Sequence, residues 1–136
     1  RQLMATVHEV LGEAEPVVLV KGAVEQVVTK CKDAYDANGE SVALDVDTIH
    51  RHVEELTAQG QRVLAFARLR LPAGSHRVSE SDIDGTLTFL GLQSMIDPPR
   101  DAVYAAVDAC RQAGVHVKMI TGDHAGTAAA IARKLK

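Results

Sequence analysis

The sequence is poor in aromatic residues and in long apolar runs. Aromatic side chains make up 3% of the 136 residues and tryptophan is absent, which leaves few platforms on which nucleic-acid bases could stack. The mildly acidic net charge of -3 gives no electrostatic footprint for nucleic acid. No apolar run approaches the roughly 20 residues that a bilayer-spanning helix needs, and no signal peptide opens the chain. We therefore expect no nucleic-acid partner and no membrane helix within these residues.

Cysteine and metal-ligand patterns are equally sparse. Cys31 and Cys110 stand far apart, each inside a predicted helix, which fits a reduced cytoplasmic compartment better than a disulfide. The six histidines do not have metal-ligand spacing: His50 and His52 are two apart on a predicted helix, so they cannot share a face. We assign no metal ligand to them.

The first half of the chain predicts an antiparallel sheet with helices. Alternation of apolar and polar residues predicts strands over Met4–Val10 and Gln61–Leu71, and VVLVKG (Val17–Gly22), after the turn GEAEP, is predicted to pair with the first of them. Helical spacing of apolar residues predicts helices over Ala23–Lys32 and Asp45–Gln59, with Gly60 as the C-terminal cap of the second.

The second half has a different pattern. The segment 72–86 is polar and serine-rich, and we interpret it as a linker between a domain over 1–71 and a domain over 87–136. After it come two predicted strands (Leu87–Ile96 and Val115–Ile120) and two predicted helices (Pro99–Ala113 and Ala125–Leu135), in alternation. Short links between such elements are typical of a parallel βαβα unit. The fold class expected is α/β (α+β): an antiparallel sheet with helices, followed by a partial Rossmann-like unit.

Two turns of the second half are candidate phosphate sites. In MITGDH, Thr121, Gly122 and Asp123 follow a predicted strand and precede a helix. Ligands of open α/β sheets gather at the carboxyl ends of strands, and a helix N-terminus there offers N–H groups to an anion. The alternative is structural, with Asp123 as a plain N-cap. In IDPPR, Asp97 ends the neighbouring predicted strand, with a structural turn as its alternative.

Two basic residues of the first half are candidate ligands for a nucleotide. Lys21 stands at a strand end before Gly22, which would let a ligand approach the backbone, and Arg62 begins a strand. Arginine suits bidentate phosphate contacts. Exposed surface positions without a ligand are the alternative for both.

The stretch DIDGT spells the nucleophile and acid of many phosphatases, with Asp82 and Asp84 as the pair. A phosphatase nucleophile sits at the end of a buried apolar strand, where burial and converging donors tune it. The residues before Asp82, SHRVSES, are too polar for such a strand, and the apolar strand follows the motif instead. We therefore interpret DIDGT as a loop.

Together the motifs are more specific than any one of them. RQLMATVH, KGAVE, GQRVLAFARL, LTFLGLQSMIDPPR and MITGDH occur in this order over essentially the whole chain. The series resembles the cytoplasmic region of P-type cation-transporting ATPases, of the bacterial calcium- or sodium/potassium-pump-like kind. In that family a nucleotide-binding domain is inserted into a phosphorylation domain of haloacid-dehalogenase type.

The resemblance implies a role for each matching residue. Lys21 and Gly22 fall on the Lys-Gly motif that lines the ATP pocket, and Arg62 on an arginine that reaches the nucleotide phosphates. Asp97 falls on the aspartate of Asp-Pro-Pro-Arg near the phosphorylation site. Thr121, Gly122 and Asp123 fall on Thr-Gly-Asp, which holds the transferred phosphoryl group. Departures from the family pattern are Val24 for a proline, Gln2 for a lysine and His124 for an asparagine.

The resemblance also implies cofactors and partners. ATP and Mg²⁺ are expected, with the Mg²⁺ ligands mostly outside this chain, as is the phosphorylated aspartate. The chain should therefore be an inactive fragment of the cytoplasmic part of an integral membrane protein. Its partners would be the rest of the pump: the core of the phosphorylation domain, the actuator domain and the membrane helices. Because a central strand would be missing beside Val115–Ile120, we expect an open strand edge that can pair with a second copy.

Two other functions remain open from the sequence. One is a small phosphatase of haloacid-dehalogenase type using Asp82 and Asp84. The other is a non-catalytic module that only binds a nucleotide.

Overall fold

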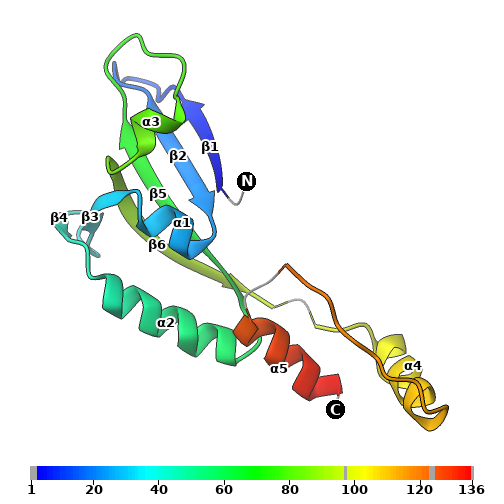
Figure 1. Cartoon of the computed structure of the whole chain (residues 1–136). Coiled ribbons are helices and arrows are strands. Elements are labelled where there is room, and N and C mark those ends of the chain that lie inside the picture. Colours follow the sequence, from blue (N-terminus) through cyan, green and yellow to red (C-terminus); the bar gives the residue numbers. More distant parts are fainter. Residues whose placement is uncertain (1–2, 97, 123–124, 136) are drawn as a thin grey trace. The chain divides into compact units, whose positions relative to one another are not determined.

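The computed structural model describes residues 3–96, 98–122 and 125–135 (Figure 1). In the described part, six strands and five helices follow one another along the chain. They are β1 (Leu3–His8), β2 (Val17–Gly22), α1 (Val24–Val28), β3 (Cys31–Tyr35), β4 (Ser41–Ala43), α2 (Val46–Ala58), β5 (Arg62–Arg70), α3 (Glu80–Ile83), β6 (Leu87–Met95), α4 (Asp101–Gln112) and α5 (Ala125–Leu135). The chain is thus a mixed α/β protein, and none of its described helices is long and apolar enough to cross a bilayer.

The chain divides into two compact units. The first unit joins Arg1–Thr48 to Val63–Gln93, and the second joins Ile49–Arg62 to Ser94–Lys136. The domain boundaries predicted over 72–86 remain a prediction.

All six strands belong to one sheet, in the order β1-β2-β5-β6-β3-β4. The pairs β1–β2, β2–β5 and β3–β4 are antiparallel, and β3–β6 is parallel. Along β2, Val18 and Val20 are buried while Leu19 and Lys21 are exposed. This alternation gives the sheet one packed face and one open face in this region.

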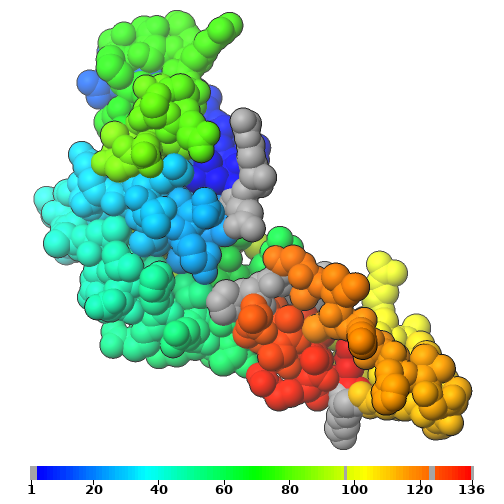
Figure 2. All heavy atoms as spheres, viewed as in Figure 1, coloured from blue at the N-terminus to red at the C-terminus, as the bar shows by residue number. Residues whose placement is uncertain are grey.

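The core of the first unit lies on the packed face. Its buried side chains come from β2, β5, α1, α3 and β6: Val18, Val20, Ala65, Ala67, Val24, Val27, Val28, Ile83, Leu87 and Phe89. Figure 2 shows the atoms of α3 and the turn after it (yellow-green) lying against those that follow α1 (light blue), where the Lys30 ammonium meets the Asp84 carboxylate at 3.1 Å. α3 and α1 therefore close one side of this core.

In the second unit, α5 contacts the turn that follows α2, at Gly60 and Gln61. α2 buries Ile49, Val53 and Thr57 along one stripe, and α5 buries Thr127 and Ala130. The Thr127 hydroxyl donates to the Gln61 carbonyl at 2.8 Å, just beyond the end of α2. α4 buries none of its residues and is tied to α5 by a hydrogen bond of 3.2 Å from the Arg111 guanidinium to the Leu135 carbonyl.

Most predicted elements are confirmed. The structure has the predicted β2 and α5, and it has β1, α2, β5, β6 and α4 with ends moved by one to two residues. The helix predicted over Ala23–Lys32 is wrong in its second half, because it ends at Val28 and the chain enters β3 at Cys31. Pairing with β6, in which Cys31 lies opposite Leu87, overrides the helical spacing there.

The strand predicted over Val115–Ile120 is also not formed. The apolar side chains of this segment are exposed, Ile120 at 96%. A strand exists only where a neighbour takes up its N–H and C=O groups, and the sheet of the described residues does not include this segment.

Candidate functional site

The open face of the sheet presents Lys21 between two apolar side chains. Lys21 of β2 lies opposite Met4 of β1 and opposite Phe66 of β5. Directly opposed residues of antiparallel strands share a face, so the three side chains form a row across three strands. Met4 is 54% exposed, Lys21 is exposed and Phe66 is half-buried. The row offers an apolar surface with a positive charge at its centre.

Gly22 follows Lys21 at the end of β2 and lies on the packed side. It is buried and pairs with Leu3 and Ala65. α1 begins two residues later, so Gly22 connects the strand that carries Lys21 to this helix.

Arg62 is the first residue of β5 and is exposed. By its contacts Arg62 belongs to the second compact unit, whereas Lys21 and Phe66 belong to the first.

Thr121 and Gly122 lie in the loop before α5 and are exposed. Among the described residues, a Cβ built on Gly122 would meet no heavy atom within 4 Å. Asp97 and Asp123, the two acidic residues predicted for the same chemistry, lie outside the described residues. Thr121 and Gly122 belong to the second compact unit.

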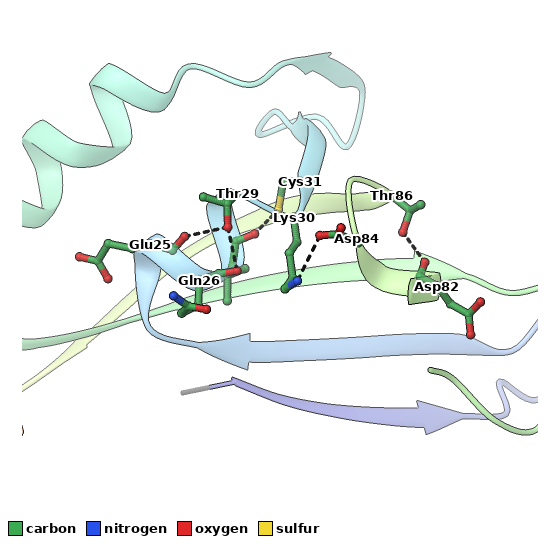
Figure 3. A network of polar contacts seen from close by, with 9 residues as sticks. Glu25, Gln26, Thr29, Lys30, Cys31, Asp82, Asp84 and Thr86 are labelled. Carbon is green, nitrogen blue, oxygen red and sulfur yellow. Dashed lines mark hydrogen bonds and ion pairs between the residues drawn. The ribbon is translucent and has the colours of Figure 1, made fainter. Parts of the chain in front are cut away.

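Asp82 and Asp84 do not form a phosphatase pair. Asp82 lies in α3, where its carboxylate accepts hydrogen bonds from the Ser79 N–H at 2.7 Å and from the Ser79 hydroxyl at 2.6 Å. These bonds lower the pKa of Asp82. Asp84 instead forms an ion pair with Lys30 (Figure 3), and the carboxylates of Asp82 and Asp84 point in different directions. Asp82 thus stabilises the start of α3: its carboxylate accepts from the N–H of Ser79, the residue that caps the helix, as in a capping box.

The contacts around α1 in Figure 3 stabilise the turn from α1 to β3. The Thr29 hydroxyl donates to the Glu25 carbonyl at 3.0 Å, and the Cys31 thiol donates to the Val27 carbonyl at 3.2 Å. Burial, with a smaller contribution from the charge of Asp33, raises the pKa of the Cys31 thiol to about 11. A thiol held neutral in this way is not a nucleophile, so the cluster is structural.

No metal centre stands out in the part of the chain that the structure describes. Within it, no group of three or more histidine, cysteine, aspartate or glutamate side chains is placed to hold an ion.

A comparison with protein families identifies the chain. Residues 1–102 match the family model described as P-type ATPase, cytoplasmic domain N. The chain belongs to the P-type cation-transporting ATPase family.

Curated relatives agree over nearly the whole chain. It is 46% identical over 134 residues to the cation-transporting ATPase pma1 of Synechocystis, covering 98% of this chain and 14% of that protein. It is 47% identical over 135 residues to the probable cation-transporting ATPase F of Mycobacterium tuberculosis, covering 99% and 15%. It is 44% identical over 128 residues to the human potassium-transporting ATPase alpha chain 2, covering 87% and 12%. The chain thus spans about one seventh of the length of these P-type ATPases.

Sequence reasoning had found Lys21 but not its two apolar neighbours. Met4 and Phe66 flank it only because β1, β2 and β5 pair in one particular register. The alternation within each strand shows which face each residue occupies, and it leaves open which residues stand opposite one another.

Proposed function

We propose that this chain is the part of a P-type pump that binds ATP, together with a portion of its phosphorylation domain. The observation that carries the proposal is the row of Met4, Lys21 and Phe66 on the open face of the sheet. In the intact pump ATP would phosphorylate an aspartate, and the phosphoenzyme cycle would move a cation across the membrane. The intact protein is then an ATPase and translocase, and this chain is on the cytoplasmic side.

The row has the chemistry that a nucleotide needs. A purine is flat and apolar on its faces, so it can lie over a thioether and an aromatic ring, and such stacking contributes roughly 1–3 kcal/mol per base. The Lys21 ammonium provides a charge for the nucleotide, and the guanidinium of Arg62 provides bidentate donors for its phosphates. These residues bind and orient ATP, which is the larger part of catalysis in phosphoryl transfer.

The last part of the chain would hold the phosphoryl end of the nucleotide. We propose that 87–136 is part of a haloacid-dehalogenase-type domain with a Rossmann-like sheet, and that Thr121, Gly122 and Asp123 support the transferred phosphoryl group. The exposed backbone at Gly122 and the start of α5 at Ala125 support this role. Asp97 would stand near the same group. ATP would arrive with Mg²⁺, which neutralises the charge on its phosphates.

Nucleotide titration tests the proposed site. ATP binding should weaken about tenfold in Lys21→Ala, as expected for the loss of one charge-assisted contact. Phe66→Ala should weaken the binding of both ATP and adenosine. Arg77→Ala is the matched control, because it removes one positive charge from the same compact unit at an exposed position outside the row. Equal affinity in wild type and Lys21→Ala would refute the assignment.

The rest of the pump is the partner that this proposal requires. Pairing of two copies through an open strand edge beside Val115–Ile120 stays a prediction, although the described structure forms no strand over these residues. Light scattering over a concentration series would detect this pairing. A molecular mass that stays at the value for a single chain at every concentration would contradict it.

A further inference from the structure

A pocket lined by basic side chains lies on the first compact unit, apart from the Lys21 row. Its volume is about 220 Å³, and its walls include Lys32 of β3, Arg68 and Arg70 of β5, and Tyr35. As far as the described residues define it, the lining carries three basic side chains and no acidic one. A pocket with this lining attracts anions.

A β-bulge places Lys32 at this pocket. In the parallel pair β3–β6, Cys31 lies opposite Leu87 and Asp33 lies opposite Thr88, so Lys32 is the extra residue of β3. An extra residue bends its strand and re-aims a side chain, and bulges of this kind are common beside functional sites. Here the bulge brings Lys32 into the wall that Thr88 also lines.

Arg68 is held in place without losing its charge. Its guanidinium stands over the ring of Tyr35, 4.6 Å from the centroid, and donates to the Tyr35 hydroxyl at 2.8 Å. Both contacts fix the direction of the guanidinium plane. Since the hydroxyl is neutral, the contact leaves the positive charge of Arg68 uncompensated.

Two carboxylates face the other basic groups. Glu13 pairs with Arg70, and Asp33 lies 4.0 Å from Lys32. The Asp33 oxygen that faces Lys32, Oδ2, also accepts a hydrogen bond from the Ser41 hydroxyl at 2.9 Å, so Lys32 shares this oxygen with a second donor. Glu15 adds a third, weaker interaction with Arg70, so the three carboxylates act on Arg70 and Lys32, and Arg68 is the basic group of the pocket that faces Tyr35 instead. Arginine carries five donors, so a contact with one carboxylate leaves Arg70 able to bind a second anion.

We propose that this pocket binds a phosphate-type oxyanion, held by Lys32, Arg68 and Arg70. The geometry is independent of the proposed ATP-binding row, although both lie on β5. Arg68 follows Phe66 by two residues, roughly 7 Å along a strand. The oxyanion can therefore come from free inorganic phosphate or from the phosphate tail of a nucleotide.

Amide NMR of the whole chain tests the proposal, with inorganic phosphate as the probe and chloride at equal ionic strength as the comparison. Phosphate should shift the resonances of Lys32, Tyr35 and Arg68 saturably, and chloride should not. Arg68→Gln should weaken the binding of phosphate about tenfold, because one charge-assisted contact is lost. Lys32→Gln should weaken it as well and is the safer variant for folding, since the Lys32 side chain is 59% exposed. Arg77→Gln, an exposed position outside the pocket, should leave the affinity unchanged.

Two further titrations separate the sources of the anion. Adenosine should leave the pocket resonances unmoved. If ATP shifts them in wild type but not in Lys21→Ala, the nucleotide tail is the source; if ATP shifts them in both, its phosphates bind the pocket as free phosphate does. Either result supports the oxyanion site. A shift with chloride equal to that with phosphate, or equal phosphate affinity in wild type, Lys32→Gln and Arg68→Gln, would overturn it. Because these variants leave Lys21 intact, failure here is distinct from failure of the ATP proposal.

Discussion

Gly60 gives the sharpest test of how the second compact unit is held together. The residue has φ of 81°, in the left-handed region, and follows the end of α2. Its N–H donates to the Thr57 carbonyl at 2.9 Å, and the next N–H, of Gln61, donates to the Leu56 carbonyl at 3.2 Å. These two bonds form a Schellman motif. The same turn presents the Gln61 carbonyl to the hydroxyl of Thr127 on α5.

The cost of Gly60→Ala follows from this geometry. An L-residue in the left-handed region costs about 1–2 kcal/mol, and the reduced freedom of alanine in the unfolded chain returns about 0.4–1 kcal/mol. A Cβ at this position would stand 3.4 Å from the Cβ of Ala130, which is a van der Waals contact rather than an overlap. The net loss should be about 1 kcal/mol, or a fall in melting temperature of about 3–5 °C.

Urea unfolding of three variants at this position checks the reasoning. Gly60→Asn should cost least, because asparagine tolerates the left-handed region, and Gly60→Val should cost most, because it is β-branched. Gly114→Ala is the matched control: Gly114 follows the end of α4 with φ of 74° and has open space around it. Its alanine variant should lose a similar amount. If Gly60→Ala were as stable as wild type, or if valine cost no more than alanine, the backbone argument would be wrong.

Three further outcomes are expected. Asp84→Asn should lower the free energy of unfolding by about 1 kcal/mol, at the upper end for a surface pair, because it leaves the largely covered ammonium of Lys30 unpaired. In the same urea assay Asp82→Asn should cost less than half of that, because the amide oxygen of asparagine can still accept the hydrogen bond from the Ser79 N–H. Thr127→Val should lose about 1 kcal/mol with its buried hydrogen bond, and equal stability of the two proteins would contradict that bond. Folding raises the pKa of the Cys31 thiol from 9.0 to about 11, so the folded state favours the neutral thiol. The stability that this preference contributes is complete below pH 9 and is lost as the pH rises toward 11. Alkaline unfolding of wild type and of Cys31→Ala should show this loss in wild type alone.

Local signals in the sequence were sufficient for much of the fold. β2 was predicted with its observed bounds because VVLVKG ends in a glycine and a helix start follows it. α2 was predicted within one residue at each end because its apolar spacing ends at Gly60, whose cap geometry the structure confirms. α5 was predicted with its observed bounds. In each case the deciding interactions lie within one turn or one strand.

Elements that depend on distant partners were missed. β3 was taken as the end of a helix because Val24, Val27, Val28 and Cys31 have helical spacing, yet β3 exists through its pairing with β6, more than fifty residues later. Val115–Ile120 was taken as a strand because its residues favour one, and in the described structure no strand pairs with it. The candidate site follows the same rule: Lys21 could be chosen from its motif, whereas Met4 and Phe66 required the register of three strands.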